Sequence, residues 1–176
     1  YNPMISYFNL SYQDLISIFL EGANLGGANL EGAKLGGANL ANVYLGDAYL
    51  VSADLREASL EGVCLSGAYL VSADLQEAVL FKADLQGAYL QYVNLRGAYL
   101  GWAWLQGANL QGANLQGADL HQANLQEANL QGANLQEANL QEANLQGAEN
   151  ITISQLRTTK TLFGCRGIPP EFESEL

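Results

Sequence analysis

The run Leu105–Gly147 reads LQGANLQGANLQGADLHQANLQEANLQGANLQEANLQEANLQG, a five-residue unit repeated almost without variation. The unit is A-(N/D)-L-x-x, and every fifth residue from Leu10 to Leu145 is leucine, with no insertion. A period of five matches neither the 3.6-residue period of an amphipathic helix nor the two-residue period of a strand. The sequence therefore predicts a repeat architecture in which each unit packs on its neighbours.

A second period, of twenty residues, lies inside the first. The unit VSADL occurs at 51–55 and again at 71–75, and units ending in AYL place tyrosine at Tyr49, Tyr69 and Tyr89. Twenty residues are four units, so a right-angle turn in each unit closes one coil and puts residue i+20 directly above residue i. Leucine and the small residue two before it then face inward, and coils stack at about 4.7–4.9 Å. Each buried leucine contributes about 1.5–3 kcal/mol.

The two residues after each leucine are expected to form the corners of the coil. Where the second of them is glycine, as at Gly22, Gly87 and Gly112, a type II turn with positive φ is easy. Where it is another residue, we expect a type I-like corner without positive φ. Such corners include Glu57, Ser72, Glu77, Lys82 and Trp102.

A tandem array of A-(N/D)-L-x-x units resembles the pentapeptide repeat family, and the resemblance covers about residues 21–149. It implies an all-β solenoid, a right-handed quadrilateral β-helix, here of about 6–7 coils with short α-helical caps at the ends. The sequence departs from the family pattern mainly before leucine, where side chains are expected to face outward. The departures are Lys34, Tyr44, Tyr49, Ser59, Cys64, Tyr69, Val79, Tyr89, Tyr99 and Trp104.

We divide the chain into an N-terminal segment at 1–20, the β-helix at 21–150 and a C-terminal cap at 151–176. Ser11, with Asp14 three residues later, resembles a helix start. This pattern predicts a short helix to about residue 20 that covers the first coil. The alternative is an imperfect first coil, because leucine keeps its five-residue register through this segment.

At the other end, Thr152 with Gln155 forms a capping-box pattern that predicts a helix at about 153–163. That helix would pack on the last coil, and a second short helix could start at Pro170. The tail looks like the C-terminal caps of cyanobacterial members of the family. If the last coil covers both Leu162 and Phe163, a monomer is favoured; an exposed apolar ridge there would favour a dimer through the C-terminal helix.

Length and charge narrow the class of protein. The chain has 176 residues and a net charge of −11, which fits one domain and disfavours direct binding to nucleic acid. No run of 18 apolar residues is present, so we expect no membrane span. We interpret Met4, the only methionine, as the natural start, with a processed secretory chain as the alternative. No basic segment precedes the apolar residues, so we expect a cytoplasmic protein without a signal peptide.

The residues that could carry chemistry are few. His121 is the only histidine, no serine or cysteine near it in the sequence could act as a nucleophile, and we interpret it as a surface residue without a role. Cys64 and Cys165 are expected to be free thiols about four coils apart, and with one histidine they make no recognised zinc site. We therefore expect no enzyme activity, no catalytic residues, no cofactor and no metal.

The outward positions of the middle coils carry most of the sequence variety. The twenty-residue rule stacks Tyr49, Tyr69 and Tyr89 on one face and places Trp104 on another, with Phe81 and Trp102 at its edge. Beyond Leu105 the surface turns to Gln, Asn and Gly, where Asn109–Asn144 should form side-chain hydrogen-bond ladders. The aromatic residues either stack on one another or form a protein-docking patch. The candidate patch is Tyr69, Phe81, Tyr89, Trp102 and Trp104.

Two functions follow from these surfaces. The first is a scaffold or protein–protein interaction module that binds an unidentified protein partner through the aromatic patch. The alternative, implied by the family resemblance, is an effector that imitates duplex DNA at a type II topoisomerase (DNA gyrase). Its support is the rod shape and the acidic columns, which otherwise are a solvated charged face. The family's resistance-type members use projecting loops, and this chain has no loop insertion. The columns contain Asp54, Glu57, Asp74 and Glu77, with Arg56 between them.

Overall fold

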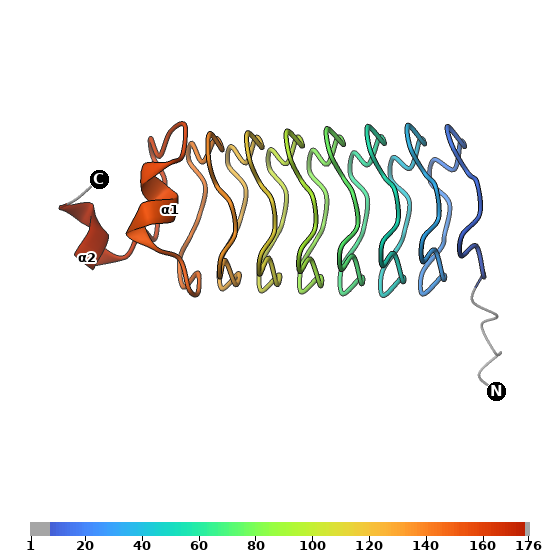
Figure 1. Ribbon diagram of the computed structural model, residues 1–176, viewed down its shortest axis with the longest axis horizontal. Helices are drawn as coiled ribbons and strands as arrows, with labels where there is room; N and C mark the ends of the chain where they lie inside the picture. Colours follow the sequence, from blue (N-terminus) through green and yellow to red (C-terminus); the bar gives the residue numbers. More distant parts are fainter. Residues whose placement is uncertain (1–7, 175–176) are drawn as a thin grey trace.

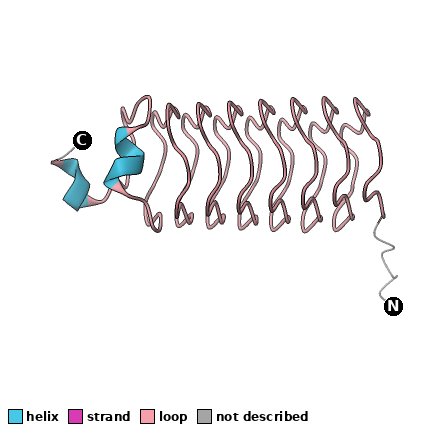
Figure 2. Cartoon of the chain, in the orientation of Figure 1, coloured by secondary structure: helices cyan, strands magenta, loops and turns pink. Residues whose placement is uncertain are grey.

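The computed structural model describes residues 8–174, and it is a straight row of stacked coils with two short helices at the C-terminal end (Figure 1). Residues 1–7 and 175–176 lie outside the described part, and the expected start at Met4 falls among them. The two helices are α1 (Ile153–Arg157) and α2 (Pro170–Glu173). Within residues 8–174 no segment is long enough to be a named strand, so the coils are drawn as loops (Figure 2).

The coils are held together by parallel bridges between residues twenty apart. The bridging residue is the one before leucine in every pair from Asn9 with Asn29 to Asn124 with Asn144, and Asn129 pairs in the same way with Glu149. Residues 9–148 thus make seven coils of twenty residues. The twenty-residue period and the four-unit coil predicted from the sequence are therefore confirmed. The right-handed winding that the family resemblance implies stays a prediction.

Each coil has four sides and four corners, which we name from the coil at residues 89–108. Sides A, B, C and D carry the bridging residues Tyr89, Asn94, Tyr99 and Trp104, and all residues twenty apart from these. Corners AB, BC, CD and DA carry the pairs Gln91–Tyr92, Arg96–Gly97, Gly101–Trp102 and Gln106–Gly107.

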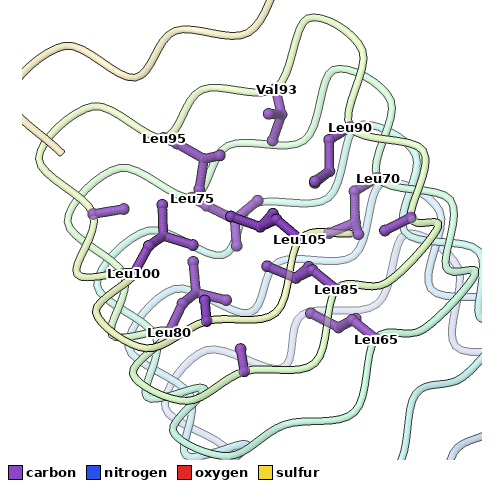
Figure 3. Packing of buried hydrophobic residues seen from close by; sticks show 14 of the residues in the cluster. Leu65, Leu70, Leu75, Leu80, Leu85, Leu90, Val93, Leu95, Leu100 and Leu105 are labelled. Atoms are coloured by element: carbon purple, nitrogen blue, oxygen red, sulfur yellow. The ribbon is translucent and has the colours of Figure 1, made fainter. Parts of the chain in front are cut away.

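The core is a continuous column of leucine with alanine or valine. Every leucine from Leu25 to Leu145 is at most 7% exposed, and the small residues between them are buried as well. Leucines from all four sides point into the same narrow interior (Figure 3). No polar or charged side chain is buried among residues 8–174. One large and one small side chain per side fill the interior. The other three side chains of each repeat unit therefore lie at the surface and are not needed for core packing.

The corners differ from the prediction, because all of them have the type II conformation. The second corner residue has positive φ at every corner from Tyr12 to Gly147, whether or not it is glycine. The non-glycine corners expected to be type I-like have φ of 59° at Glu57, 57° at Ser72, 58° at Glu77, 57° at Lys82 and 60° at Trp102. That prediction was wrong.

Hydrogen bonds between coils explain this uniformity. The N–H of Ser52 donates to the carbonyl of Val71 in the next coil over 3.0 Å, and every other corner from Tyr12 to Glu127 repeats this bond. A type I corner would turn the central peptide over and break these bonds to the coils on both sides. A left-handed non-glycine residue costs about 1–2 kcal/mol. Two lost hydrogen bonds cost about as much or more when a group stays unpaired, so the corners share one conformation.

The asparagine or aspartate before leucine closes a local hydrogen bond at the corner. Its Oδ1 accepts the N–H two residues later, for example Asp74 from Gln76 over 3.1 Å and Asn114 from Gln116 over 3.2 Å. This N–H is the corner donor that the bonds between coils leave free. The expected ladders are also present on sides A and B, as from Asn129 to Asn109 over 3.4 Å.

Residues 8–20 form part of the solenoid, and no helix is found among them. Asp14 bridges Lys34 and Phe19 bridges Asn39, as in every later coil. The predicted helix over 11–20 was therefore wrong, and its alternative, a first coil in register, is what the structure shows. The bonds to the next coil outweigh the capping pattern, because Tyr12 and Ser17 take the same left-handed corner as their successors. The β-helix thus begins at residue 9, not at residue 21.

Helix α1 begins where the sequence predicts and ends earlier. The Thr152 side chain accepts from the N–H of Gln155, and the Gln155 side chain accepts from the N–H of Thr152, which completes the capping box. Leu156 is buried on the last coil. The Gln155 side chain also donates to the carbonyls of Leu130 and Ala133, both over 2.9 Å. The helix thus replaces part of the missing next coil.

Residues 161–166 form one more repeat unit and are not part of the predicted helix at 153–163. Thr161 bridges Asn139 and Arg166 bridges Asn144, at a separation of 22 residues. The two extra residues are taken up by α1, so Leu162 occupies a leucine position out of the sequence register. Leu162 is half-buried and Phe163 is 75% exposed. The two residues are neither both covered nor both exposed, and the oligomeric state stays a prediction.

The described residues contain no helix long and apolar enough to span a membrane.

Candidate protein-interaction surface

Three tyrosines form a stacked ladder on side A, as the twenty-residue period predicts. The ring centroids of Tyr49 and Tyr69 are 4.9 Å apart and those of Tyr69 and Tyr89 are 4.7 Å apart, with both pairs within 3° of parallel. These distances match the stacking of the coils, so each ring covers one face of the next. Part of this aromatic surface therefore packs on itself, as the alternative interpretation of the patch expected.

The tryptophans lie around corner CD and not on the tyrosine side. Trp102 is the second residue of the corner, and Trp104 follows on side D. Their side chains are 48% and 55% exposed, and no stacking partner is found for either within residues 8–174. Phe81 is the first residue of the same corner one coil earlier. The structure thus groups Phe81, Trp102 and Trp104.

The other two residues of the candidate patch lie around a corner from this group. Tyr69 and Tyr89 belong to side A, so side D and corner DA separate them from corner CD. The five candidate residues therefore form two neighbouring aromatic groups on adjoining sides. We call Phe81, Trp102 and Trp104 the corner group and keep the tyrosine ladder separate.

A hollow of about 400 Å³ opens beside the corner group, on side C. The ring centroids of Phe81 and His121 are 6.4 Å apart across it, and the rings are tilted by 30°. Between them lies Gly101, where a Cβ atom would come within 2.2 Å of Cε1 of His121. Glycine at this position therefore lets the imidazole lie directly on the backbone. The hollow is lined by Glu61, Val79, Phe81, Tyr99, Gly101, Asp119 and His121.

His121 and Tyr99 belong to this site although the sequence did not indicate them. His121 was interpreted as a surface residue without a role, yet its ring forms one wall of the hollow. The signal that could have found it is the twenty-residue spacing of Phe81, Gly101 and His121, in which a glycine separates two aromatic rings along one corner. Tyr99, 54% exposed on side C, lies beside the same glycine.

Two carboxylates face this hollow. Oδ1 of Asp119 accepts hydrogen bonds from the backbone N–H of His121 over 3.2 Å and from the Asn139 side chain over 2.9 Å. The same oxygen lies 3.0 Å from Nδ1 of His121. Oδ2 of Asp119 and the carboxylate of Glu61 have no hydrogen bond or ion pair within residues 8–174. The hollow is thus aromatic on two sides and has unused negative charge at its edge.

The acidic column on side B and corner BC is partly neutralised within the chain. Arg56 binds Asp54 through two hydrogen bonds of 2.8 and 2.7 Å and lies 3.9 Å from Asp74. The hydrogen bonds from Arg56 hold the pKa of Asp54 below its usual value. Asp74 also accepts from the Asn94 side chain over 2.9 Å. The column is therefore a mixed polar surface more than a continuous anionic stripe.

Both cysteines are free, as the sequence predicts. Burial raises the pKa of the Cys165 thiol to about 11. Within residues 8–174 no three His, Cys, Asp or Glu side chains gather in a way that could hold a metal ion.

Comparison with known proteins agrees with this geometry. The family model for pentapeptide repeats matches in eight copies, within the segments 9–40, 33–70, 65–97, 73–112, 94–132 and 113–149. No curated protein sequence matches the chain.

Among solved structures, HetL from the cyanobacterium Nostoc sp. strain PCC 7120 is a pentapeptide repeat protein involved in the regulation of heterocyst differentiation. HetL is 31% identical, the match covers 91% of this chain and 87% of HetL, and the TM-score is 0.37. A trypsin-treated form of QnrB1, a plasmid-mediated fluoroquinolone resistance protein, is 17% identical over 90% of this chain and 89% of its own, with a TM-score of 0.50. At that identity the second likeness concerns the fold alone. The family model covers residues 9–149 in overlapping segments, well over half of the chain, so the chain belongs to the pentapeptide repeat family.

Proposed function

We propose that the protein is a non-enzymatic interaction module that binds a protein partner through the corner group Phe81, Trp102 and Trp104. The observation that carries this proposal is the exposure of the two tryptophans, 48% and 55%, at positions where the fold does not need them. The interior is filled by leucine and small residues. The positions of Trp102 and Trp104 in the other coils carry mostly polar or small residues, namely Asn42, Gly62, Lys82, Gln122 and Glu142 at the corner and Tyr44, Cys64, Asp84, Asn124 and Asn144 on side D. Tryptophan is enriched among the residues that dominate the energy of protein interfaces.

The hollow next to the corner group supports the same proposal. Interface anchors are most effective when they sit beside a pocket that the partner can fill. A second hollow, of about 410 Å³, lies on the other side of Trp102 and reaches Glu142 and Arg166. Corner CD is therefore uneven and partly apolar. The coils after Leu105 instead present a flat surface of glutamine and asparagine, which offers few apolar side chains that could anchor a partner.

Imitation of DNA at DNA gyrase remains the second candidate, and the surface charge favours it less. Duplex DNA carries one negative charge per about 1.7 Å of axis, which is roughly three charges per coil rise of about 4.8 Å. The whole chain has a net charge of −11 over seven coils, fewer than two per coil. Arg56 neutralises part of the column that comes nearest to such a stripe.

The test is affinity capture from host lysate with the intact protein and with a variant carrying Phe81→Ser, Trp102→Ser and Trp104→Ser. Circular dichroism first establishes that both proteins fold. A matched control carries Tyr12→Ser and Tyr92→Ser, which removes aromatic residues 69% and 62% exposed at the diagonally opposite corner AB. We expect one partner that the intact protein and the control retain and the corner variant loses.

Equal capture by all three proteins would overturn the proposed site. The gyrase alternative is tested in parallel with a supercoiling assay on purified DNA gyrase. An effect on supercoiling that survives the corner variant, and disappears when the carboxylates of Asp54, Glu57, Asp74 and Glu77 are replaced by amides, would favour that alternative.

A further inference from the structure

We propose that the hollow on side C binds an extended segment of the protein partner in which one apolar residue lies between two basic residues. This inference rests on the proposed function and adds the chemistry and the spacing of the segment that is recognised. It follows from three features: the order of side chains along the hollow, the available carboxylates at its two ends, and the distance between those ends.

The hollow lies between two columns of side chains that follow the solenoid axis. The columns are Val79, Tyr99 and Asp119 on side C, and Glu61, Phe81, Gly101 and His121 at the first position of corner CD. The His121 ring covers Gly101, so the corner column has no gap at the glycine. The open space therefore runs between the two columns, and an occupant would lie along the axis.

The middle of the hollow is apolar. Val79 and Phe81 come from one coil and Tyr99 from the next, and all three line the same space. Val79 and Phe81 are half-buried and Tyr99 is 54% exposed, so each keeps apolar surface in contact with water. A volume of about 400 Å³ is small for a ligand site but admits one apolar side chain of a partner. Covering this surface with such a side chain is favourable.

Both ends of the hollow carry negative charge. Glu61 lies one coil before the apolar middle and Asp119 one coil after it. The Glu61 carboxylate and Oδ2 of Asp119 have no hydrogen bond or ion pair within residues 8–174. The ammonium nitrogen of Lys82 lies 5.1 Å from the centroid of the Phe81 ring, but Lys82 does not line the hollow. A basic residue of the partner would therefore meet an available carboxylate at each end.

The length and width of the hollow fit an extended chain. Three coil rises separate the level of Glu61 from that of Asp119, which is roughly 14 Å. In an extended chain the residues i, i+2 and i+4 point to the same side, and i and i+4 are about 13 Å apart. The two columns are two residues apart, at most about 7 Å, which is narrower than a helix of about 10–12 Å. The segment that fits is therefore basic-x-apolar-x-basic.

The test uses the protein's only histidine as a reporter, because the His121 Cε1–H proton gives a single well-separated NMR signal. The probe is a blocked peptide, Gly-Lys-Ser-Leu-Ser-Lys-Gly, titrated at fixed pH and low salt. One control peptide has serine in place of leucine, and a second has the order Gly-Lys-Lys-Leu-Ser-Ser-Gly. We expect a saturable shift with the probe and about tenfold weaker binding of the serine peptide. The reordered peptide, which reaches one carboxylate only, should bind about twofold to fivefold more weakly.

Three variants of the protein locate the binding. Val79→Asn replaces the apolar wall by the residue most common before leucine in this chain, so the coil is preserved. It should lower the affinity for the probe to about that for the serine peptide. Glu61→Gln should weaken binding of the probe about twofold to fivefold. Glu127→Gln is the matched control, because it removes the same charge at corner DA, which side D separates from the hollow; it should leave binding unchanged.

Equal binding of the three peptides, no saturable shift, unchanged binding by Val79→Asn, or equal effects of Glu61→Gln and Glu127→Gln would each overturn the inference. The proposed function is judged separately in the capture experiment. If a variant with both Glu61→Gln and Val79→Asn captures the partner fully while the corner variant loses it, the interaction surface stands and the recognition of this segment does not.

Discussion

Replacing Ser72 by glycine should stabilise the solenoid, although it removes a side chain. Ser72 has a φ of 57°, and its side chain makes no hydrogen bond within residues 8–174. A non-glycine residue in the left-handed region costs about 1–2 kcal/mol. The greater freedom of glycine in the unfolded chain costs about 0.5–1 kcal/mol. The difference predicts a gain in the free energy of unfolding of roughly 0.5–1 kcal/mol for Ser72→Gly.

The reverse change at Gly107 should have the opposite effect. Gly107 has a φ of 63°, and a Cβ added there would meet no atom within 4 Å. Gly107→Ala therefore tests the backbone conformation alone, and we expect a loss of roughly 0.5–1 kcal/mol. Gly36→Ala serves as the control, because Gly36 is a first corner residue without positive φ and with room for a methyl group. There the stiffer unfolded chain predicts a gain of about 0.4–1 kcal/mol.

The assay is urea unfolding followed by circular dichroism, with thermal unfolding as a second measurement. For a chain of this size, 1 kcal/mol shifts the thermal midpoint by roughly 2–4 °C. Type I corners would reverse both signs, so that Ser72→Gly destabilises and Gly107→Ala stabilises. That pair of results would refute the conclusion that one corner conformation runs along the whole solenoid.

Three further outcomes follow from the structure. Leu80→Ala should lower the free energy of unfolding, measured by urea titration, by about 2.7–5 kcal/mol, because Leu80 is fully buried. A loss below about 1 kcal/mol, as is usual for a surface substitution, would contradict a packed core at this position. In a Cys64→Ser variant, Cys165 should react slowly with a disulfide reagent at mildly alkaline pH, because only the thiolate reacts and burial raises the pKa of this thiol to about 11. The reaction should become faster as the pH rises toward about 11. Equal rates in folded and urea-unfolded protein would contradict this expectation. Asp54→Asn should destabilise slightly at neutral pH, because the bond to Arg56 holds the folded pKa of Asp54 below about 3.9, its usual value in an unfolded chain. The difference from the native protein should shrink as pH falls below that value, where the unfolded carboxylate takes up protons first.

The repetitive part of the fold could be predicted from the sequence because its cause is local and periodic. The leucine period sets the coil, and the twenty-residue spacing stacks Tyr49 on Tyr69 as expected. The corner conformation could not be read in this way. Ser72 alone favours negative φ, and the bond from its N–H to the carbonyl of Gln91 in the next coil decides otherwise. The turn type is therefore set by the hydrogen bonds between stacked corners and not by the residue at a single corner.

The ends and the candidate site show the same limit. Ser11 and Asp14 resemble a helix start, yet this segment bonds to the coil that follows it. Helix α1 shifts the register of the last repeat unit by two residues, so Leu162 does not fall on the five-residue period of the other leucines. The prominence of Trp102 and Trp104 could be predicted from their outward positions. The role of His121 could not, because it depends on the tilt of its ring over Gly101.

Site-specific photo-cross-linking tests the central claim, that corner CD contacts a protein partner, most directly. A photoreactive phenylalanine is placed at Trp102, and in a second protein at Gln131, an exposed first corner residue on the opposite corner AB. We expect a covalent adduct with one host protein from position 102 and none from position 131. Excess native protein should compete for this adduct, and the Phe81→Ser, Trp104→Ser variant should not. Adducts of equal yield at both positions, or competition by that variant, would contradict it.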